Sequence, residues 1–149
     1  MKIYDTILDV LRRKSHEVWS ITPESTVYRA IEMMADKHVG ALLVIADDKL
    51  VGIISERDYA RKVILRGKSS KETRVAEIMT SPIIFVESRN AVDECLKIMT
   101  DNRIRHLPVI EKEKVIGIVS IGDLVNWIIS AQDHTIQQLQ NYVTRKYPP

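Results

Sequence analysis

The chain is poor in several residue types, and each shortage narrows what the protein can be. A single cysteine among 149 residues, Cys95, excludes an internal disulfide and any metal site built from several thiolates. No apolar run approaches the roughly 20 residues needed to span a bilayer. The first residues also lack the continuous apolar core of a signal peptide. We therefore expect a cytoplasmic protein that does not enter a membrane.

Neither the charge of the chain nor any of its motifs indicates nucleic-acid binding or catalysis. The 22 Lys and Arg residues are interleaved with 20 Asp and Glu residues, so a net charge of +2 gives no general argument for nucleic acid. The sequence has no nucleophile elbow, no Walker loop and no His-Glu-x-x-His motif, and its four histidines lack metal-ligand spacing. We predict a protein that is not an enzyme, with no metal site and no catalytic cofactor.

What the sequence does contain is an internal repeat. Residues 18–64 align without a gap on residues 83–129, and identical residues coincide at many positions. Two copies are too few for a solenoid, so the repeat predicts two like subdomains packed about a pseudo-twofold axis. Such an axis leaves two equivalent clefts between the halves. Each half alone is too small to bury a comfortable core.

Each repeat shows the same order of apolar patterns. Apolar residues at helical spacing predict an amphipathic helix behind the N-caps Ser25 and Asn90. Two short apolar runs around a polar turn then predict β-hairpins over residues 41–54 and 107–119. A second helix is predicted after each hairpin. The sequence therefore predicts an α/β (α+β) fold in two similar halves.

These patterns divide the chain into five segments. They are an N-terminal helical segment (1–17), a first repeat domain (18–66), a polar linker with a short helix (67–81), a second repeat domain (82–131) and a C-terminal tail (132–149). The tail has apolar residues at helical spacing. We expect the two terminal segments to cap the core or form dimer contacts, or else to dock to another protein.

The sharpest local pattern lies where each hairpin meets its second helix. Residues 52–58 read GIISERD, and residues 117–123 read GIVSIGD. The glycine lets another group approach the strand, and the Ser and Asp stand at a helix N-terminus that favours an anion such as phosphate. An aspartate there can also accept both hydroxyls of a ribose. The same spacing forms a helix capping box, and the sequence leaves both interpretations open.

Basic residues precede the second hairpin. Arg103, Arg105 and His106 stand in a row of four, whereas the matching residues 38–41 of the first repeat are mostly small. Guanidinium groups suit phosphate oxygens through paired hydrogen bonds, although solvated surface charge is an equally good interpretation. This difference between the repeats predicts two unequal clefts, and Arg57 in the first corner fits the same inequality.

Taken together in both copies, these features resemble a tandem pair of cystathionine-β-synthase (CBS) domains, called a Bateman module. The resemblance runs from about Val18 to Ser130 and includes the sequence RHLPV at residues 105–109. It implies two β-α-β-β-α subdomains packed through their sheets, and a dimer of modules. It further implies a regulatory signal-transduction module that senses energy or redox state. The ligand would be an adenosine compound, namely AMP, ADP, ATP, NAD(H) or S-adenosylmethionine, held in the clefts.

The resemblance also implies roles for particular residues. The corner aspartates Asp58 and Asp123 would bind ribose. Phosphate would be held by Ser55, Ser120, Arg57, Arg103, Arg105 and His106. Residues at positions that often line the adenine or sugar are Thr22, Val39, Gly40, Ala41 and Thr80. The first repeat lacks the basic residue and proline common at residues 40–44, which favours unequal sites or one occupied site.

Other functions stay open on the sequence alone. The main alternative is a dimerising scaffold without a small-molecule ligand, in which both corners are only helix caps. A nucleotide-processing enzyme is a weaker hypothesis, because the chain offers no evident nucleophile, general base or metal site. Nucleic-acid binding through the basic cluster is unlikely but would weaken steeply with salt. The predicted partners are an adenine nucleotide, a second copy of the chain and an unknown protein target.

Overall fold

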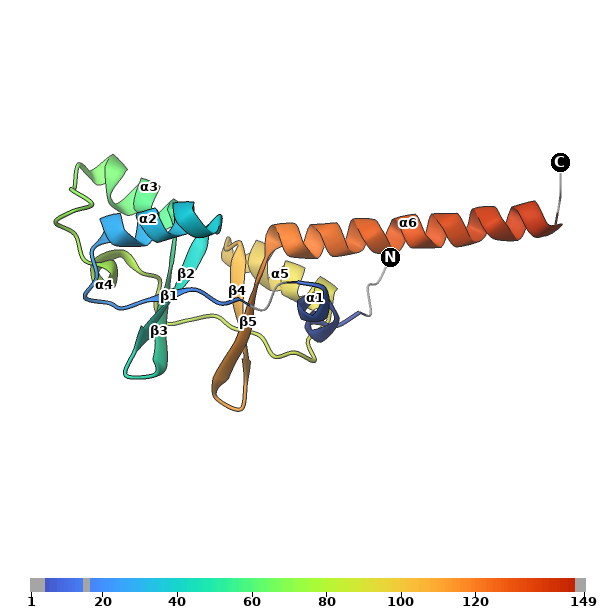
Figure 1. Ribbon diagram of the computed structural model, residues 1–149, viewed down its shortest axis with the longest axis horizontal. Helices are drawn as coiled ribbons and strands as arrows, with labels where there is room; N and C mark the ends of the chain where they lie inside the picture. The colour runs from blue at the N-terminus through green and yellow to red at the C-terminus, as the bar shows by residue number, and fades with distance from the viewer. Residues whose placement is uncertain (1–4, 15–16, 147–149) are drawn as a thin grey trace.

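The structure is a computed structural model that describes residues 5–14 and 17–146. The first repeat contains β1 (Ser20–Ile21), α2 (Val27–Lys37), β2 (Ala41–Ala46), β3 (Lys49–Ser55), α3 (Glu56–Lys62) and the 3-10 helix η1 (Ile64–Arg66). The second repeat contains α5 (Val92–Asn102), β4 (His106–Glu111), β5 (Lys114–Ser120) and α6 (Ile121–Lys146). Two short helices, α1 (Ile7–Arg13) and α4 (Val75–Ile78), precede the repeats. The two hairpins lie side by side, and α6 leaves the second repeat on the side away from the first (Figure 1). The predicted mixed fold in two halves is confirmed.

The two hairpins have the same construction. Strand β2 pairs antiparallel with β3, and β4 with β5, and each pair has an irregularity at the same point of its register. Both turns place two residues at positive φ, namely Asp47 (50°) and Asp48 (62°), and Lys112 (48°) and Glu113 (66°). Two such residues are typical of a type I′ turn, which matches the twist of the flanking strands. The halves differ at the first strand, because β1 pairs with β2 while Val86 forms only a single bridge to β4.

Helices α2 and α5 bury one apolar face each, as their spacing predicts. Their N-caps lie one residue later than predicted, at Thr26 and Ala91 instead of Ser25 and Asn90. The Thr26 hydroxyl accepts a hydrogen bond from a backbone N–H of the first helical turn. Ser25 uses its backbone carbonyl elsewhere, to accept from Val75 of helix α4 at 2.8 Å. The correction has a physical reason, because Ser25 and Asn90 anchor the two short helices.

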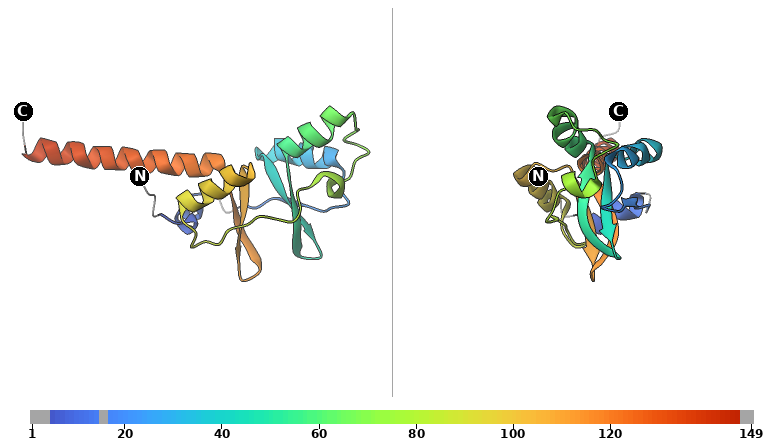
Figure 2. Two further views of the ribbon diagram at one scale, coloured as in Figure 1. Left: turned by 180° about the vertical axis from the view of Figure 1, so that it is seen from behind. Right: turned by 90° about the vertical axis from the view of Figure 1, so that its left-hand side faces the viewer.

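Each short helix leads into one repeat along the chain but packs against the other repeat. Val75 and Ile78 of α4 belong to the core of the first repeat, although α4 leads into the second. Ile7, Val10 and Leu11 of α1 belong to the core of the second repeat, although α1 leads into the first. Figures 1 and 2 show α1 beside the second repeat and α4 beside the first. This exchange ties the halves together, and it means that α1 caps the second core.

The exchange explains why both corners begin with glycine. A Cβ atom on Gly52 would lie 2.6 Å from the sulfur of Met79, the residue that directly follows α4 in the chain. A Cβ atom on Gly117 would lie 2.7 Å from Cδ2 of Leu11 in α1. Real Cβ contacts are longer, so a side chain at either position would force the Met79 or Leu11 side chain to move.

Helix α6 is one continuous element of 26 residues. It joins the predicted second helix of the repeat to most of the predicted tail, so the boundary expected at residue 132 falls inside it. In the part of the chain that the structure describes, no helix is both long and apolar enough to cross a membrane.

Candidate functional site

The corner of the first repeat is a genuine capping box. Ser55 ends β3 and caps α3, and its backbone N–H and hydroxyl lie 2.9 and 3.1 Å from Oδ2 of Asp58. The Asp58 backbone N–H donates in return to the Ser55 hydroxyl oxygen at 3.2 Å. The capping interpretation of this motif is therefore confirmed.

The second carboxylate oxygen of Asp58 is turned to other groups. Oδ1 lies 3.1 Å from Nζ of Lys62 and accepts a hydrogen bond from the Thr80 hydroxyl at 3.3 Å. The residue is only 9% exposed. A carboxylate oxygen has two lone pairs, so a ligand hydroxyl that binds Oδ1 would take the place of the Lys62 ammonium or the Thr80 hydroxyl, while Oδ2 still caps the helix.

Asp58 lines a cleft of about 400 Å³ between the two repeats. This volume falls within the range of small-molecule sites. The walls come from the first corner, the next turn of α3, the linker after α4 and the residues leading into β4. The predicted site residues that the structure brings together here are Gly40, Ser55, Arg57, Asp58, Thr80, Arg103, Arg105 and His106.

The cleft also contains residues that the sequence did not single out. They are Ile53, Glu56, Arg61, Lys62, Ile84 and Ile104. Helical periodicity could have indicated the two cations, because Arg61 and Lys62 lie one turn beyond Arg57 and Asp58. The isoleucines carry no such signal, since they look like ordinary core positions. They give the cleft an apolar side.

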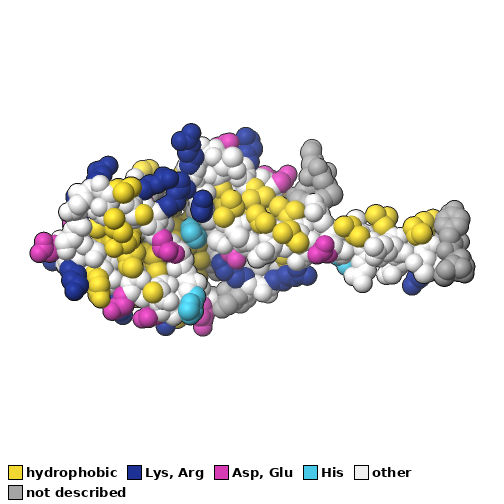
Figure 3. Space-filling model, turned by 90° about the horizontal axis from the view of Figure 1, so that it is seen from above, with side chains coloured by type: hydrophobic (Ala, Val, Ile, Leu, Met, Phe, Trp, Pro, Cys, Tyr) yellow, Lys and Arg dark blue, Asp and Glu magenta, His cyan; other side chains and the backbone are white. Residues whose placement is uncertain are grey.

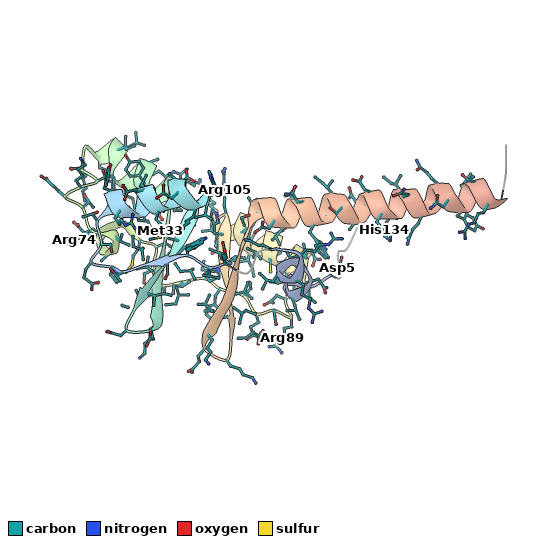
Figure 4. The ribbon with its side chains drawn as sticks, in the orientation of Figure 1. Asp5, Met33, Arg74, Arg89, Arg105 and His134 are labelled. Carbon is teal, nitrogen blue, oxygen red and sulfur yellow. The ribbon has the colours of Figure 1, made fainter. Side chains whose placement is uncertain are left out.

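The charge of the cleft is mainly positive. Its lining has two acids, Glu56 and Asp58, against five cations, which are Arg57, Arg61, Lys62, Arg103 and Arg105. Nη1 of Arg57 donates to the Arg103 backbone carbonyl at 3.4 Å, which joins the two repeats across the cleft. Lys and Arg side chains gather over the junction of the halves (Figure 3), where Arg105 is labelled in Figure 4. This arrangement favours an anionic ligand with an apolar portion.

Five predicted site residues lie outside this cleft, namely Thr22, Val39, Ala41, Ser120 and Asp123. Thr22 is exposed on the surface of the first repeat. When the repeat alignment is extended toward the N-terminus, Ser15 matches the cleft residue Thr80, but Ser15 lies outside the described residues. Val39 packs against the first core and Ala41 is buried in β2. In the repeat alignment these two match the cleft residues Ile104 and His106, but they do not line the hollow beside the second corner either.

The second corner has different surroundings. The Ser120 N–H donates to Oδ2 of Asp123 at 2.8 Å, as in the first corner. The same oxygen accepts from Nζ of Lys14 at 2.6 Å, and Lys14 also donates to the Ile118 carbonyl at 2.7 Å. Burial alone would raise the pKa of Asp123, but the hydrogen bonds from Lys14 and Ser120 outweigh it and lower that pKa. Among the described residues, a shallower hollow of about 260 Å³ lies beside this ion pair.

His106 lies between the two corners and should make stability depend on pH. Burial first, and then the charges of Lys14 and Arg105, lower its pKa from 6.5 despite the opposing charge of Asp123. The unfolded chain therefore binds this proton more readily, and stability falls as pH drops below about 6.5. We expect His106→Gln to flatten the fall in melting temperature between about pH 7 and 5. His134→Gln, on the exposed part of α6, is the control, and equal slopes in all three proteins would contradict the assignment.

Metal binding has no support in the described residues. Among residues 5–14 and 17–146, no group of three or more His, Cys, Asp or Glu side chains could hold a metal ion. The lining of the cleft offers hydrogen bonds, positive charge and apolar contact to a ligand.

Comparison with known proteins agrees with this geometry. The sequence profile of the CBS domain matches residues 6–65 and 75–130. The chain belongs to the CBS domain family and is a CBS domain pair, a regulatory or signal-transduction module. The resemblance seen in the sequence is confirmed.

Three similar proteins illustrate the range of the family. A mitochondrial CBS domain-containing protein of Arabidopsis thaliana is 41% identical over 95% of this chain and 73% of its own. A Burkholderia ambifaria structure, described as a signal-transduction protein with CBS domains, is 48% identical with a TM-score of 0.83, covering 85% of this chain and 96% of its own. A CBS domain pair solved with 5′-methylthioadenosine and S-adenosyl-L-methionine is 23% identical with a TM-score of 0.76, covering 87% and 99%. The last likeness shows the fold alone.

Proposed function

We propose that this chain is a sensor that binds one adenosine nucleotide in the cleft beside Asp58 and reports it by a change in how modules are arranged. The observation that carries the proposal is the composition of that cleft. Asp58 Oδ1 provides the acceptor for ribose hydroxyls, five cations suit the phosphate groups, and the three isoleucines provide an apolar contact for the base. The ligand class is AMP, ADP, ATP or NAD(H), because S-adenosylmethionine has no phosphate for these cations to bind.

Two further observations support this choice. The volume of about 400 Å³ admits a nucleotide. The same fold holds adenosine compounds in the CBS pair solved with 5′-methylthioadenosine and S-adenosyl-L-methionine. The hollow beside Asp123 and Lys14 is smaller, about 260 Å³, so we expect one ligand per chain.

The signal would arise from unequal affinity. A ligand that binds two arrangements equally shifts nothing. The proposed ligand contacts both repeats at once, because Asp58 belongs to the first and Arg103 and Arg105 to the second. An arrangement that brings these groups together would therefore be favoured by the bound nucleotide, and a separate protein or the assembly itself would respond.

The test is thermal unfolding of protein freed of carried-over ligand, in the presence of AMP, ADP, ATP, NAD, NADH or S-adenosylmethionine, with GTP as the control. A ligand at 100 times its dissociation constant should add about 2.7 kcal/mol. For a chain of this size the melting temperature should rise by roughly 5 to 10 °C. Calorimetry should then give one site per chain.

The capping boxes favour one alternative, a dimerising scaffold with no small-molecule ligand. They show that Ser55 and Asp58 already have a structural role. No rise with any adenosine compound would overturn the sensor and leave this alternative. An equal rise with GTP would instead indicate a site for phosphate that does not recognise the base.

A further inference from the structure

The outer part of α6 stands clear of the rest of the protein. Every residue from 132 to 145 is exposed. Figure 1 shows this part of the helix projecting well beyond the two repeats. Lone helices of this length are marginal in water, because most helical stability in proteins comes from packing an apolar face. We therefore expect this exposed part of α6 to pack against a partner.

An apolar stripe runs along this helix. Its members follow one another at alternating intervals of four and three residues: Val125, Ile129, Gln132, Ile136, Leu139 and Val143. We call them the α6 stripe. The five apolar members are 43% to 60% exposed, and hydrophobic side chains mark the projecting helix in Figure 3. Alternating steps of four and three give the repeat of a two-stranded coiled coil.

The residue types within the stripe select the partner. In heptad notation, Ile129, Ile136 and Val143 occupy a positions, and Leu139 occupies a d position. Branched residues at a with leucine at d favour a parallel two-stranded coiled coil. We propose that the α6 stripe binds the α6 stripe of a second copy of this chain, parallel and in register.

Gln132 supports the parallel register. In this arrangement it faces Gln132 of the second copy, and two amides can donate to and accept from each other. In an antiparallel pair a d residue faces an a residue, so the Gln132 amide would lie against isoleucine without a hydrogen-bond partner. A buried polar group left without a partner is costly, and the antiparallel arrangement is therefore disfavoured.

The flanking positions do not oppose the pairing. Asp133 and Gln140 occupy e positions, and Thr135 occupies a g position. In a parallel pair, Thr135 faces Gln140 of the second copy, and both are uncharged. No like charges meet across this part of the seam, so electrostatic repulsion does not act against association of two copies.

The stripe is continuous with the surface of the module. From Val125 to Val143 it extends about 27 Å, which is short for a coiled coil acting alone. Its first residue lies on the module beside Ile121, which is 38% exposed. Hydrophobic side chains continue from the upper surface of the second repeat onto the helix (Figure 3). Parallel pairing would place two modules side by side and add their apolar surface to the seam.

Crosslinking tests both the stripe and its direction. In the parallel pair, Val143→Cys places the new thiols of two copies next to each other, and a short bismaleimide should join most chains into covalent dimers. Asn141→Cys, on the opposite face at an f position, should give at least tenfold less dimer. The native thiol does not interfere, because Cys95 is buried and its pKa is raised to about 12 by burial and by Glu94 and Asp93.

A second pair of variants ties the result to the stripe. Ile136→Asp in the Val143→Cys protein should reduce the dimer at least tenfold, whereas Gln137→Asp, its exposed neighbour, should not. Both substitutions lie on the projecting helix and leave the folded module intact. Dimer formation that is equal at residues 143 and 141, or insensitive to Ile136→Asp, overturns the proposal. So does a chain that forms no covalent dimer, which would leave the stripe to a different protein.

Discussion

Replacing Asp58 with alanine should weaken adenosine nucleotide binding by roughly 100-fold or more, while Asp123→Ala should leave the affinity unchanged. Hydrogen bonds to a charged group contribute about 1.5–3 kcal/mol each, and a ribose offers two hydroxyls to the Asp58 carboxylate. Each 1.4 kcal/mol corresponds to about a factor of ten in affinity. Isothermal titration of both variants with the nucleotide found in the thermal panel measures the effect.

The two substitutions remove the same capping interaction but differ in the cleft that the aspartate lines. Both aspartates accept a hydrogen bond from the backbone N–H of a capping serine, so each variant should lose about 1 kcal/mol of stability from its cap. Only Asp58 lines the larger cleft. Loss of binding in Asp123→Ala alone would move the site to the second corner. Unchanged binding in both would remove ribose recognition by aspartate altogether.

The repeat itself accounts for much of the fold that the sequence predicted. Identical residues at matching positions gave two hairpins, and the structure has them in the same register, with Val44 opposite Gly52 and Val109 opposite Gly117. The amphipathic helices follow from short-range spacing, which depends only on residues within a few turns. Predictions of this kind succeed because the interactions that decide them are local.

The exchange of α1 and α4 could not be derived in this way. Val10 and Val75 match when the repeat alignment is extended toward the N-terminus, and both are buried. Equivalence of position says nothing about which of two similar cores each helix joins. That choice depends on contacts between residues far apart in the chain, such as the hydrogen bond from the Ile7 N–H to the Asn90 carbonyl.

The inequality of the two corners shows the same limit. The sequence indicated unequal clefts from the basic residues before β4. It gave no sign that Lys14 would reach Asp123 at 2.6 Å. In the extended alignment Lys14 corresponds to Met79, the residue packed against Gly52. The exchanged segment therefore supplies the cation that pairs with Asp123, whereas Asp58 pairs with Lys62 of its own helix and the thioether packs on Gly52. This difference becomes visible only when the segments are placed.

Leu11→Ala should destabilise the protein by about 2–5 kcal/mol, as expected when a buried leucine is truncated. Leu11 lies in α1, is 5% exposed and fills the core of the second repeat. Leu8→Ala changes the same residue type in the same helix at a position that is 37% exposed, so its cost should stay below about 1 kcal/mol. Urea unfolding of both variants measures the difference. Equal small effects would mean that α1 does not belong to the second core.

A double-mutant cycle with Gly117 identifies the contact that Leu11 makes. Gly117→Ala alone should cost about 1–3 kcal/mol, because the new Cβ would lie 2.7 Å from Cδ2 of Leu11. In the double variant with Leu11→Ala, the added methyl group fills the space that the shortened side chain leaves. The free energy of unfolding should therefore fall by less in the double variant than the sum of the losses in the two single variants. Contacting residues show coupling of about 0.5–3 kcal/mol, whereas independent sites are additive. Additive costs would mean that Leu11 does not contact Gly117. Close packing of the exchanged helix would then not account for the glycine at the second corner.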